Sequence, residues 1–210
     1  PTNGGLVNPA AAVGHIARSH GIPFLLDACQ SVGQLPVNVD DLGCDMLSAT
    51  GRKYLRGPRG SGFLYVRESM IEQLEPPMLD LHAATWTDEG DFSIRTDARR
   101  FENWECNVAA KIGLGVAADY AQALDPAVTG PRIQCLAAHL RDCLSIVPGV
   151  TVHDRGAEMC GIVSFSLKDV AADRVKAALA ARKINVSVSP AAWTLIDITR
   201  RQIPSLVRAS

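Results

Sequence analysis

The chain has 210 residues, of which 47% are hydrophobic and 20% are charged, and its formal net charge is -1. A chain of this size can bury a sizeable core as one large domain or a domain and a half. The balanced charge excludes a global basic field of the kind that binds nucleic acid or an anionic membrane. No apolar run reaches the length of a membrane span and no signal peptide pattern opens the chain. We therefore expect a cytoplasmic protein that binds neither nucleic acid nor a membrane.

Helical and strand patterns alternate in the first half of the chain. Residues 9–20 carry apolar side chains at helical spacing and end at Gly21, which predicts a helix. Short apolar runs predict a fully buried strand at 24–26, closed by Asp27, and further strands at 44–48 and 62–66. Such strands, separated by helices and glycine-rich turns, predict an α/β fold with a mainly parallel sheet and helices on both faces.

The second half of the chain lacks the regular alternation of helical and strand patterns seen in the first half. Residues 67–100 have no clear period, which predicts loop and connector, whereas residues 104–124 and 125–148 predict two long helices. A strand at 162–167, a helix at 170–183 and a strand at 184–188 then predict a small α+β domain. We therefore expect a large-domain portion in residues 1–124 and a small, truncated domain in residues 125–210. Both ends look cut, which predicts a segment of a longer protein.

The six cysteines are scattered without CxxC pairs or histidines at ligand spacing. The sequence therefore predicts no metal site and no compact disulfide framework, and free buried thiols are expected.

A turn rich in glycine and positive charge carries the most distinctive candidate residue. Lys53 lies in the stretch from Gly51 to Gly62, which holds three arginines and four glycines and runs directly into the third predicted strand. A lysine amine can form a Schiff base with an aldehyde, and glycine-rich loops can cradle a phosphate through backbone N–H groups. Taken alone, such a lysine is more often an exposed basic residue of a surface turn.

Asp27 offers a charge partner for a cationic cofactor. It ends a predicted strand, and ligands of α/β sheets bind at the carboxyl ends of strands. A carboxylate there can keep a pyridine nitrogen protonated, although an N-cap role is the commoner explanation for a single aspartate. Gln30 could reach a ring oxygen from the same turn, while Thr50 and Arg52 could bind a phosphate. Together these residues suggest a pyridoxal phosphate (PLP) site.

The same residues carry a family resemblance. The segments Thr2–Gly5, Leu26–Gln30 and Ser48–Lys53, followed by Gly57–Val66, resemble the class V aminotransferase family. This family belongs to the fold type I PLP-dependent enzymes and includes cysteine desulfurases, selenocysteine lyases and related carbon–sulfur lyases. The resemblance covers essentially the whole chain, from within the PLP-binding large domain into the small domain.

The resemblance implies roles for individual residues. Lys53 would form the internal aldimine with PLP, and Asp27 would pair with the pyridine nitrogen. Gln30 would bond the ring oxygen or the Schiff-base side, and Asn3 matches an asparagine near the ring hydroxyl and the substrate. The remaining matches are Thr50 and Arg52 toward the phosphate, although many members have histidine in place of Arg52, and Arg208 toward the substrate carboxylate.

The chain departs from the family pattern at several places. Persulfide-forming desulfurases carry a cysteine on a small-domain loop, and the stretch Ile184–Val207 contains none, which disfavours a persulfide-type desulfurase. Arg100–Glu105 replaces a small-residue turn that lends a phosphate contact across the dimer in relatives. The phosphate loop and the ring-stacking residue of the family would precede Pro1. Within the family, the resemblance is nearest to aminotransferases and to ergothioneine-type carbon–sulfur lyases.

The resemblance thus implies a homodimeric PLP enzyme that acts on an amino acid through an external aldimine and a Cα carbanion, with Lys53 as the base. Either the amino group is transferred or a sulfur substituent is eliminated. Two other hypotheses remain open on the residues alone: a phosphate- or nucleotide-binding module without catalysis, and an inert fragment of a longer enzyme.

Overall fold

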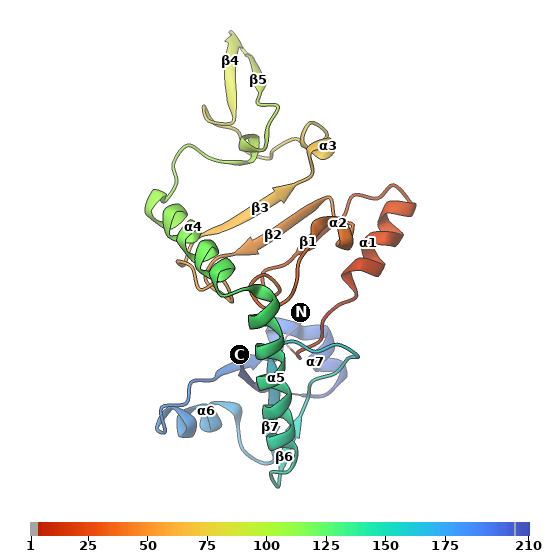
Figure 1. The fold of residues 1–210 in the computed structure, drawn as a ribbon, viewed down its shortest axis with the longest axis vertical. Coiled ribbons are helices and arrows are strands. Elements are labelled where there is room, and N and C mark those ends of the chain that lie inside the picture. Colours follow the sequence, from red (N-terminus) through yellow and green to blue (C-terminus); the bar gives the residue numbers. More distant parts are fainter. Residues whose placement is uncertain (1–3, 204) are drawn as a thin grey trace. The chain divides into compact units, whose positions relative to one another are not determined.

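The computed structural model describes residues 4–203 and 205–210 (Figure 1). These residues form two compact units. The first contains Pro9–Gly33 and Val37–Ala123 and is called the lysine unit here, because Lys53 belongs to it. The second contains Leu124–Ser210 together with the described part of Pro1–Asn8 and with Gln34–Pro36, and is called the C-terminal unit. Each unit contains a sheet and helices, which confirms the predicted α/β class.

The lysine unit contains a three-stranded sheet with the order β1-β2-β3. Its strands are β1 (Leu25–Asp27), β2 (Met46–Thr50) and β3 (Gly62–Val66). β1 runs parallel to β2, whereas β3 runs antiparallel to it. This part of the sheet thus has one parallel and one antiparallel pairing, because the turn after β2 brings the chain straight back as an antiparallel neighbour.

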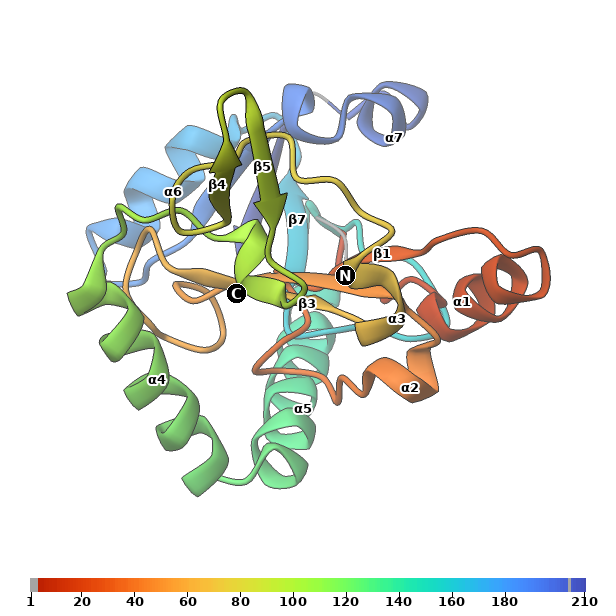
Figure 2. The same ribbon diagram turned by 90° about the horizontal axis from the view of Figure 1, so that it is seen from above.

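The helices of the lysine unit are α1 (Ala10–Ser19), α2 (Val39–Leu42), α3 (Glu68–Ile71) and α4 (Val108–Ala123). α1 and α2 lie side by side (Figure 2), and Gly14 of α1 lies directly against the carbonyl group of Leu42. A side chain at position 14 would collide with that backbone, so the glycine allows the two helices to approach. Asn38 begins α2 by accepting the N–H of Asp40 at 2.9 Å.

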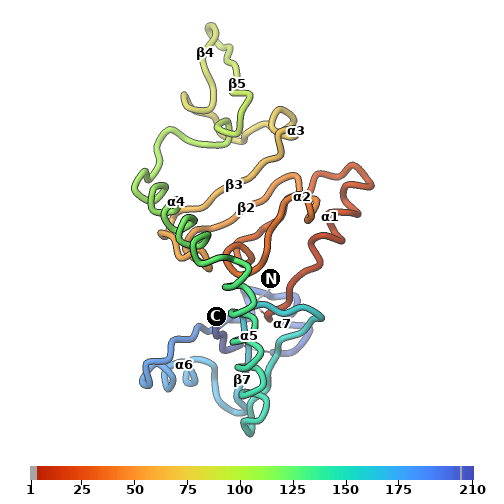
Figure 3. The backbone as a smooth tube through the Cα atoms, in the orientation of Figure 1, coloured from red at the N-terminus to blue at the C-terminus, as the bar shows by residue number. Residues whose placement is uncertain are grey.

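A hairpin occupies the stretch that the sequence predicted as loop. β4 (Ala84–Asp88) pairs with β5 (Asp91–Ile94), and the hairpin projects beyond the three-stranded sheet (Figure 3). Asp80 holds its base by accepting backbone N–H groups from His82 at 2.8 Å and from Trp104 at 2.7 Å. The short 3₁₀ helix η1 (Ala98–Phe101) follows β5. Its strands span only five and four residues, which is too short for their alternation of apolar and polar side chains to stand out in the sequence.

The C-terminal unit contains a four-stranded antiparallel sheet with the order β6-β7-β9-β8. Its strands are β6 (Val150–Val152), β7 (Val163–Leu167), β8 (Ser187–Pro190) and β9 (Ser205–Ala209). The helices are α5 (Pro126–Ser145), α6 (Ala172–Ala180) and α7 (Leu195–Arg200), with the 3₁₀ turn η2 (Ala191–Thr194) before α7. Phe165 of β7 and Val207 of β9 form a buried cluster against α5 and α6 side chains such as Leu144 and Val175.

The outer strands of the lysine unit, β1 and β3, are more exposed than the sequence predicted. The strand around residues 24–26 was expected to be fully buried, yet Leu25 is 55% exposed. Phe63 and Leu64 of β3 are 43% and 48% exposed. The core of this unit instead forms on β2 and its surroundings, where Ala28, Cys44, Leu47 and Ala49 are buried. Among the described residues, no helix is long and apolar enough to cross a membrane.

Candidate cofactor site

The ends of two neighbouring strands bring the candidate residues of the lysine unit together. β1 and β2 are parallel, with Asp27 opposite Ser48, so the chain leaves both strands at the same edge of the sheet. The N–H of Ala28 donates to the Ser48 carbonyl at 2.8 Å, which extends the pairing past Asp27. Thr50 ends β2, and Lys53 follows three residues later. The topology therefore creates a ligand position of the kind found at carboxyl strand ends.

The Asp27 carboxylate is ionised and held in a tight turn. Its Oδ1 accepts the backbone N–H of Cys29 at 2.9 Å. This hydrogen bond, assisted by the Cys29 thiol and the positive charge of Lys53, lowers the pKa of Asp27 below its usual value. The carboxylate therefore caps a turn, as its local sequence suggested, and is negatively charged at neutral pH.

The turn that carries Lys53 is closed by its own backbone. The N–H of Arg56 donates to the Lys53 carbonyl at 2.8 Å, and the N–H of Gly57 donates to the Gly51 carbonyl at 2.7 Å. Lys53 is half-buried, whereas Arg52 is exposed. The guanidinium carbon of Arg56 lies 4.9 Å from the centre of the Tyr120 ring of α4, a cation–π distance that holds this arginine against the helix.

Two glycines of this turn, Gly51 and Gly57, serve close packing and not a backbone phosphate cradle. A Cβ at Gly51 would lie 2.5 Å from the Ser61 hydroxyl oxygen and 2.8 Å from a methyl group of Leu114. The N–H of Gly51 donates to the Ser61 carbonyl at 2.9 Å, and that of Gly57 is used within the turn. The expectation that these N–H groups face a phosphate is therefore wrong for both residues. The phosphate contacts expected of Thr50 and Arg52 stay predictions, and the Thr50 hydroxyl donates to the Ser61 carbonyl at 3.4 Å.

Two residues near the site were not singled out from the sequence. Gly33 has a φ of 92° and lies so close to the lysine turn that a Cβ there would stand 2.6 Å from the Tyr54 carbonyl carbon. It therefore joins the turn after β1 to the turn after Lys53. Cys29 is half-buried, and burial together with Asp27 raises the pKa of its thiol. In the sequence, Gly33 could have been noticed as a glycine three residues after Gln30, and Cys29 as a close neighbour of Asp27.

The other predicted residues fall in different places. Gln30 is half-buried in the turn that Asp27 caps. Asn3 lies outside the described residues. Arg208 is half-buried on β9, in the middle of the sheet of the C-terminal unit, where it pairs in register with Ser164 of β7 and Ser187 of β8. Arg208 and Lys53 belong to different units. The substrate role of Arg208 and the cofactor role of Lys53 are therefore two independent predictions.

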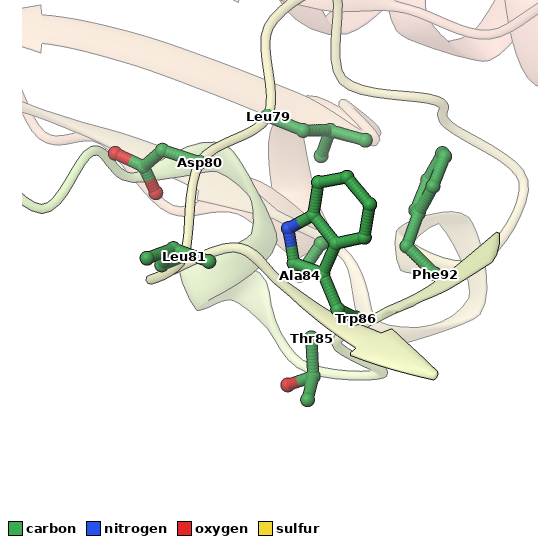
Figure 4. A pocket seen from close by; sticks show the side chains of 7 residues that line it. All are labelled: Leu79, Asp80, Leu81, Ala84, Thr85, Trp86 and Phe92. Atoms are coloured by element: carbon green, nitrogen blue, oxygen red, sulfur yellow. The ribbon is translucent and has the colours of Figure 1, made fainter. Parts of the chain in front are cut away.

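The segment Arg100–Glu105 follows the hairpin and is tied to its base. Arg100 is buried, and a Glu102 carboxylate oxygen lies 3.4 Å from His82 Nε2 and forms an ion pair with Lys111 at 3.5 Å. A cavity of about 310 Å³ opens on the hairpin itself (Figure 4), where Trp86 and its cross-strand partner Phe92 stand beside each other. None of the seven residues that line this cavity is a predicted cofactor residue. It is an apolar feature of the hairpin.

The functional groups at the ends of β1 and β2 are of the kinds that can hold PLP. An amine can attach to the cofactor aldehyde, an ionised carboxylate can bond a protonated pyridine nitrogen, and a hydroxyl and a guanidinium can bond a phosphate. Lys53, Asp27, Thr50 and Arg52 supply these groups from one edge of one sheet. The ionised state of Asp27 is the form that the pyridine partner requires.

Comparison with known proteins identifies the family. Residues 2–210 match the sequence profile described as "Aminotransferase class-V". A "Probable cysteine desulfurase" from Halalkalibacterium halodurans is 31% identical over 174 residues, which is 79% of this chain and 40% of that protein. The apo structure of a cysteine desulfurase from Thermococcus onnurineus superposes with a TM-score of 0.87 at 26% identity, over 98% of this chain and 52% of that one. A solved mutant of a protein named C-DES, with glycine covalently linked to its PLP cofactor, has the same fold, with a TM-score of 0.82 at 23% identity over 99% of this chain and 52% of that one.

The chain therefore belongs to the class V aminotransferase family, whose members use PLP as cofactor. It spans about half the length of the proteins that it matches. One expectation must be corrected: the absence of a cysteine from Ile184–Val207 was taken to disfavour a persulfide-type desulfurase, yet the curated relatives are named cysteine desulfurases. A solved neighbour is also described in complex with its reaction product, cysteine persulfide. The missing loop cysteine was too local a criterion to exclude that chemistry.

Proposed function

We propose that the chain carries the cofactor-attachment half of a PLP-dependent enzyme that acts on a sulfur-containing amino acid and cleaves its carbon–sulfur bond. The observation that carries this proposal is the cluster of Lys53, ionised Asp27 and Thr50 at the carboxyl ends of parallel strands β1 and β2. The substrate class is supported by the names of the relatives, which are cysteine desulfurases. Homodimer formation stays a prediction from the family resemblance, and a cytoplasmic location stays a prediction from the sequence.

Each residue would make a distinct contribution. Lys53 would attach the cofactor through its amine and, once displaced by the substrate, would take the proton from the substrate Cα. Asp27 would hold the proton on the pyridine nitrogen, and Gln30 would bond the ring oxygen. Thr50 and Arg52 would hold the phosphate. When bound, the cofactor supplies an electron-accepting ring that stabilises negative charge at the substrate Cα.

Two residues would position the substrate. Arg208 would bind its carboxylate through a bidentate pair, which fixes the orientation of the bonds at Cα and hence the bond that breaks. Asn3, outside the described residues, would add a contact near the ring hydroxyl. Both assignments follow from the family resemblance.

Cofactor binding is the first test. Titration of the 210-residue chain with PLP should give saturable, stoichiometric binding and a yellow absorbance band. Lys53→Ala should abolish this band, whereas Lys111→Ala, which changes an exposed lysine of the same unit, should retain it. Equal loss in both variants would contradict a specific role for Lys53. Absence of binding to the unsubstituted chain would support the inert-fragment hypothesis.

The reaction is tested with a panel of cysteine, cystine and cysteine sulfoxides, each with and without a keto acid. Carbon–sulfur cleavage predicts sulfur release that needs no keto acid, together with pyruvate or alanine as the carbon product. Mass analysis of the six cysteines after turnover would detect a persulfide on the protein. Amino transfer that strictly requires a keto acid, without sulfur release, would overturn the proposed reaction and favour an aminotransferase.

A further inference from the structure

The C-terminal unit contains a second polar site, built from residues that the cofactor site does not use. A cavity of about 400 Å³ is lined by His153 and Ser166, with Gln202 and Ser205 among its other polar residues. The register of β6 and β7 places His153 opposite Ser164, so His153 and Ser166 are diagonal neighbours on one face of the sheet. Phe165 between the two serines points to the opposite, buried face.

The two side chains form a short hydrogen bond. Ser166 Oγ lies 2.7 Å from His153 Nε2. The backbone of His153 is fixed on both sides, because its N–H donates to the Ser164 carbonyl at 2.8 Å and its carbonyl accepts from the Arg201 guanidinium at 2.6 Å. A nucleophile and a base held at this separation by a rigid sheet have the geometry required for hydroxyl activation.

The environment keeps the imidazole in its neutral form. Burial lowers the pKa of His153 below its usual value, and the positive charge of Arg201 lowers it further. A neutral ring that carries its proton on Nδ1 can accept the Ser166 proton at Nε2. At neutral pH the pair is therefore in the state in which histidine acts as a general base.

The start of α6 provides donors at the same cavity. Ala171 and Ala172 line the cavity, and Ala171 begins the helix without a side-chain cap. Within residues 4–203 and 205–210, no group accepts the backbone N–H of Ala172, which lines the cavity together with the carboxylate-bearing Asp169. Unpaired N–H groups at a helix start favour negative charge, as in sites that stabilise an oxyanion.

We propose that Ser166 is an acyl-accepting nucleophile, with His153 as its base, for a small ester that enters this cavity. Ser166 Oγ bonds to the ester carbonyl carbon while its proton moves to His153 Nε2. The carbon–oxygen bond to the alcohol breaks, and His153 returns the proton to the departing oxygen. Water then repeats the sequence on the acyl-serine, releasing the carboxylic acid and restoring the hydroxyl.

A fluorophosphonate probe tests the proposal directly, because an activated serine displaces its fluoride and becomes covalently labelled. The 210-residue chain should be labelled at Ser166, with the position assigned by fragmenting the peptide that contains Ser164 and Ser166. His153→Gln should slow labelling by about 100-fold or more, the usual contribution of a general base. Ser145→Ala, which changes an exposed serine on α5, should label like the unsubstituted chain.

A second measurement guards against variants that fail to fold. With p-nitrophenyl acetate, the unsubstituted chain should release a burst of p-nitrophenolate and gain one acetyl group on Ser166. Prior denaturation should abolish both, and circular dichroism should show that His153→Gln remains folded. Absence of any adduct on Ser166, or labelling of folded His153→Gln at the unsubstituted rate, would overturn the proposal. Neither readout depends on PLP, so its failure is separate from failure of the proposed cofactor function.

Discussion

The two sheets of this protein differ in how completely their apolar strands are covered. In the C-terminal unit, Ile162, Leu206 and Val207 are at most 1% exposed. In the lysine unit, Leu25 of β1 is 55% exposed, and α4 carries a stripe of exposed apolar side chains at four-residue spacing, namely Val108, Ile112, Val116 and Tyr120. The four-stranded sheet thus has its core within the described chain, whereas the site-bearing sheet has only one well-packed strand. Stability should therefore concentrate in the C-terminal unit.

The largest effect is expected from the buried ion pair of the C-terminal unit. Arg141 Nε lies 2.7 Å from Asp154 Oδ2, and the Asp154 side chain is 1% exposed. Asp154→Ala would leave the arginine unpaired and remove the acceptor of the Ser164 hydroxyl, at a cost of about 3–5 kcal/mol in unfolding free energy. Denaturant titration gives the total loss. Hydrogen exchange should show it first in β7, and a loss confined to β1–β3 would contradict the comparison.

A matched pair of isoleucines measures the difference in packing. Ile162→Ala, at a fully buried position, should lower the free energy of unfolding by about 2–5 kcal/mol because it leaves a cavity. Ile112→Ala on α4, at a position that is 65% exposed, should change it by less than about 0.5 kcal/mol. Chemical denaturation of both variants decides the point. Comparable losses would mean that the α4 stripe is covered in solution, for example by a second copy of the chain.

The approach of Gly33 to the lysine turn gives the next effect. Gly33→Ala forces an alanine into a φ of 92° and against the Tyr54 backbone, whereas Gly21→Ala meets a φ of 64° in open space. Backbone strain costs about 1–3 kcal/mol at either position. The additional clash with Tyr54 should make the loss of unfolding free energy larger for Gly33→Ala than for Gly21→Ala, and Gly33→Ala should also weaken PLP binding. Equal effects of the two variants on PLP affinity would show that Gly33 does not position the lysine turn.

The smallest effect concerns pH. The pKa of Asp27 is lowered in the folded protein, so its stabilising contribution is present above the unfolded pKa of about 3.9 and is lost as pH falls through the folded value. Comparison of denaturation midpoints between neutral pH and pH about 3 should show a slightly steeper acid loss for the unsubstituted chain than for Asp27→Asn. Parallel profiles would indicate that Asp27 is free of the Cys29 N–H in solution.

The sequence predicted what local patterning determines. The helices at α1, α4 and α5 and the strand at β3 were expected within a few residues, because apolar spacing and boundary residues specify them. The hairpin β4–β5 and strands β6 and β9 were missed, since strands of three to five residues show too little pattern to be recognised from sequence alone. The cluster of Asp27, Thr50 and Lys53 was predictable because these residues lie at or just after the carboxyl ends of two predicted strands. The contact between Gly33 and Tyr54, and the pairing of His153 with Ser166, depend on tertiary structure alone.

The central claim is that Lys53 is the point of cofactor attachment, and peptide mass analysis after borohydride reduction tests it most directly. The chain incubated with stoichiometric PLP and then reduced should carry one phosphopyridoxyl group, on the peptide that contains Lys53. The same treatment of Asp27→Asn should leave the attachment residue unchanged but lower its occupancy. A group distributed over Lys111, Lys168 and other surface lysines, with Lys53 unmodified, would contradict the account.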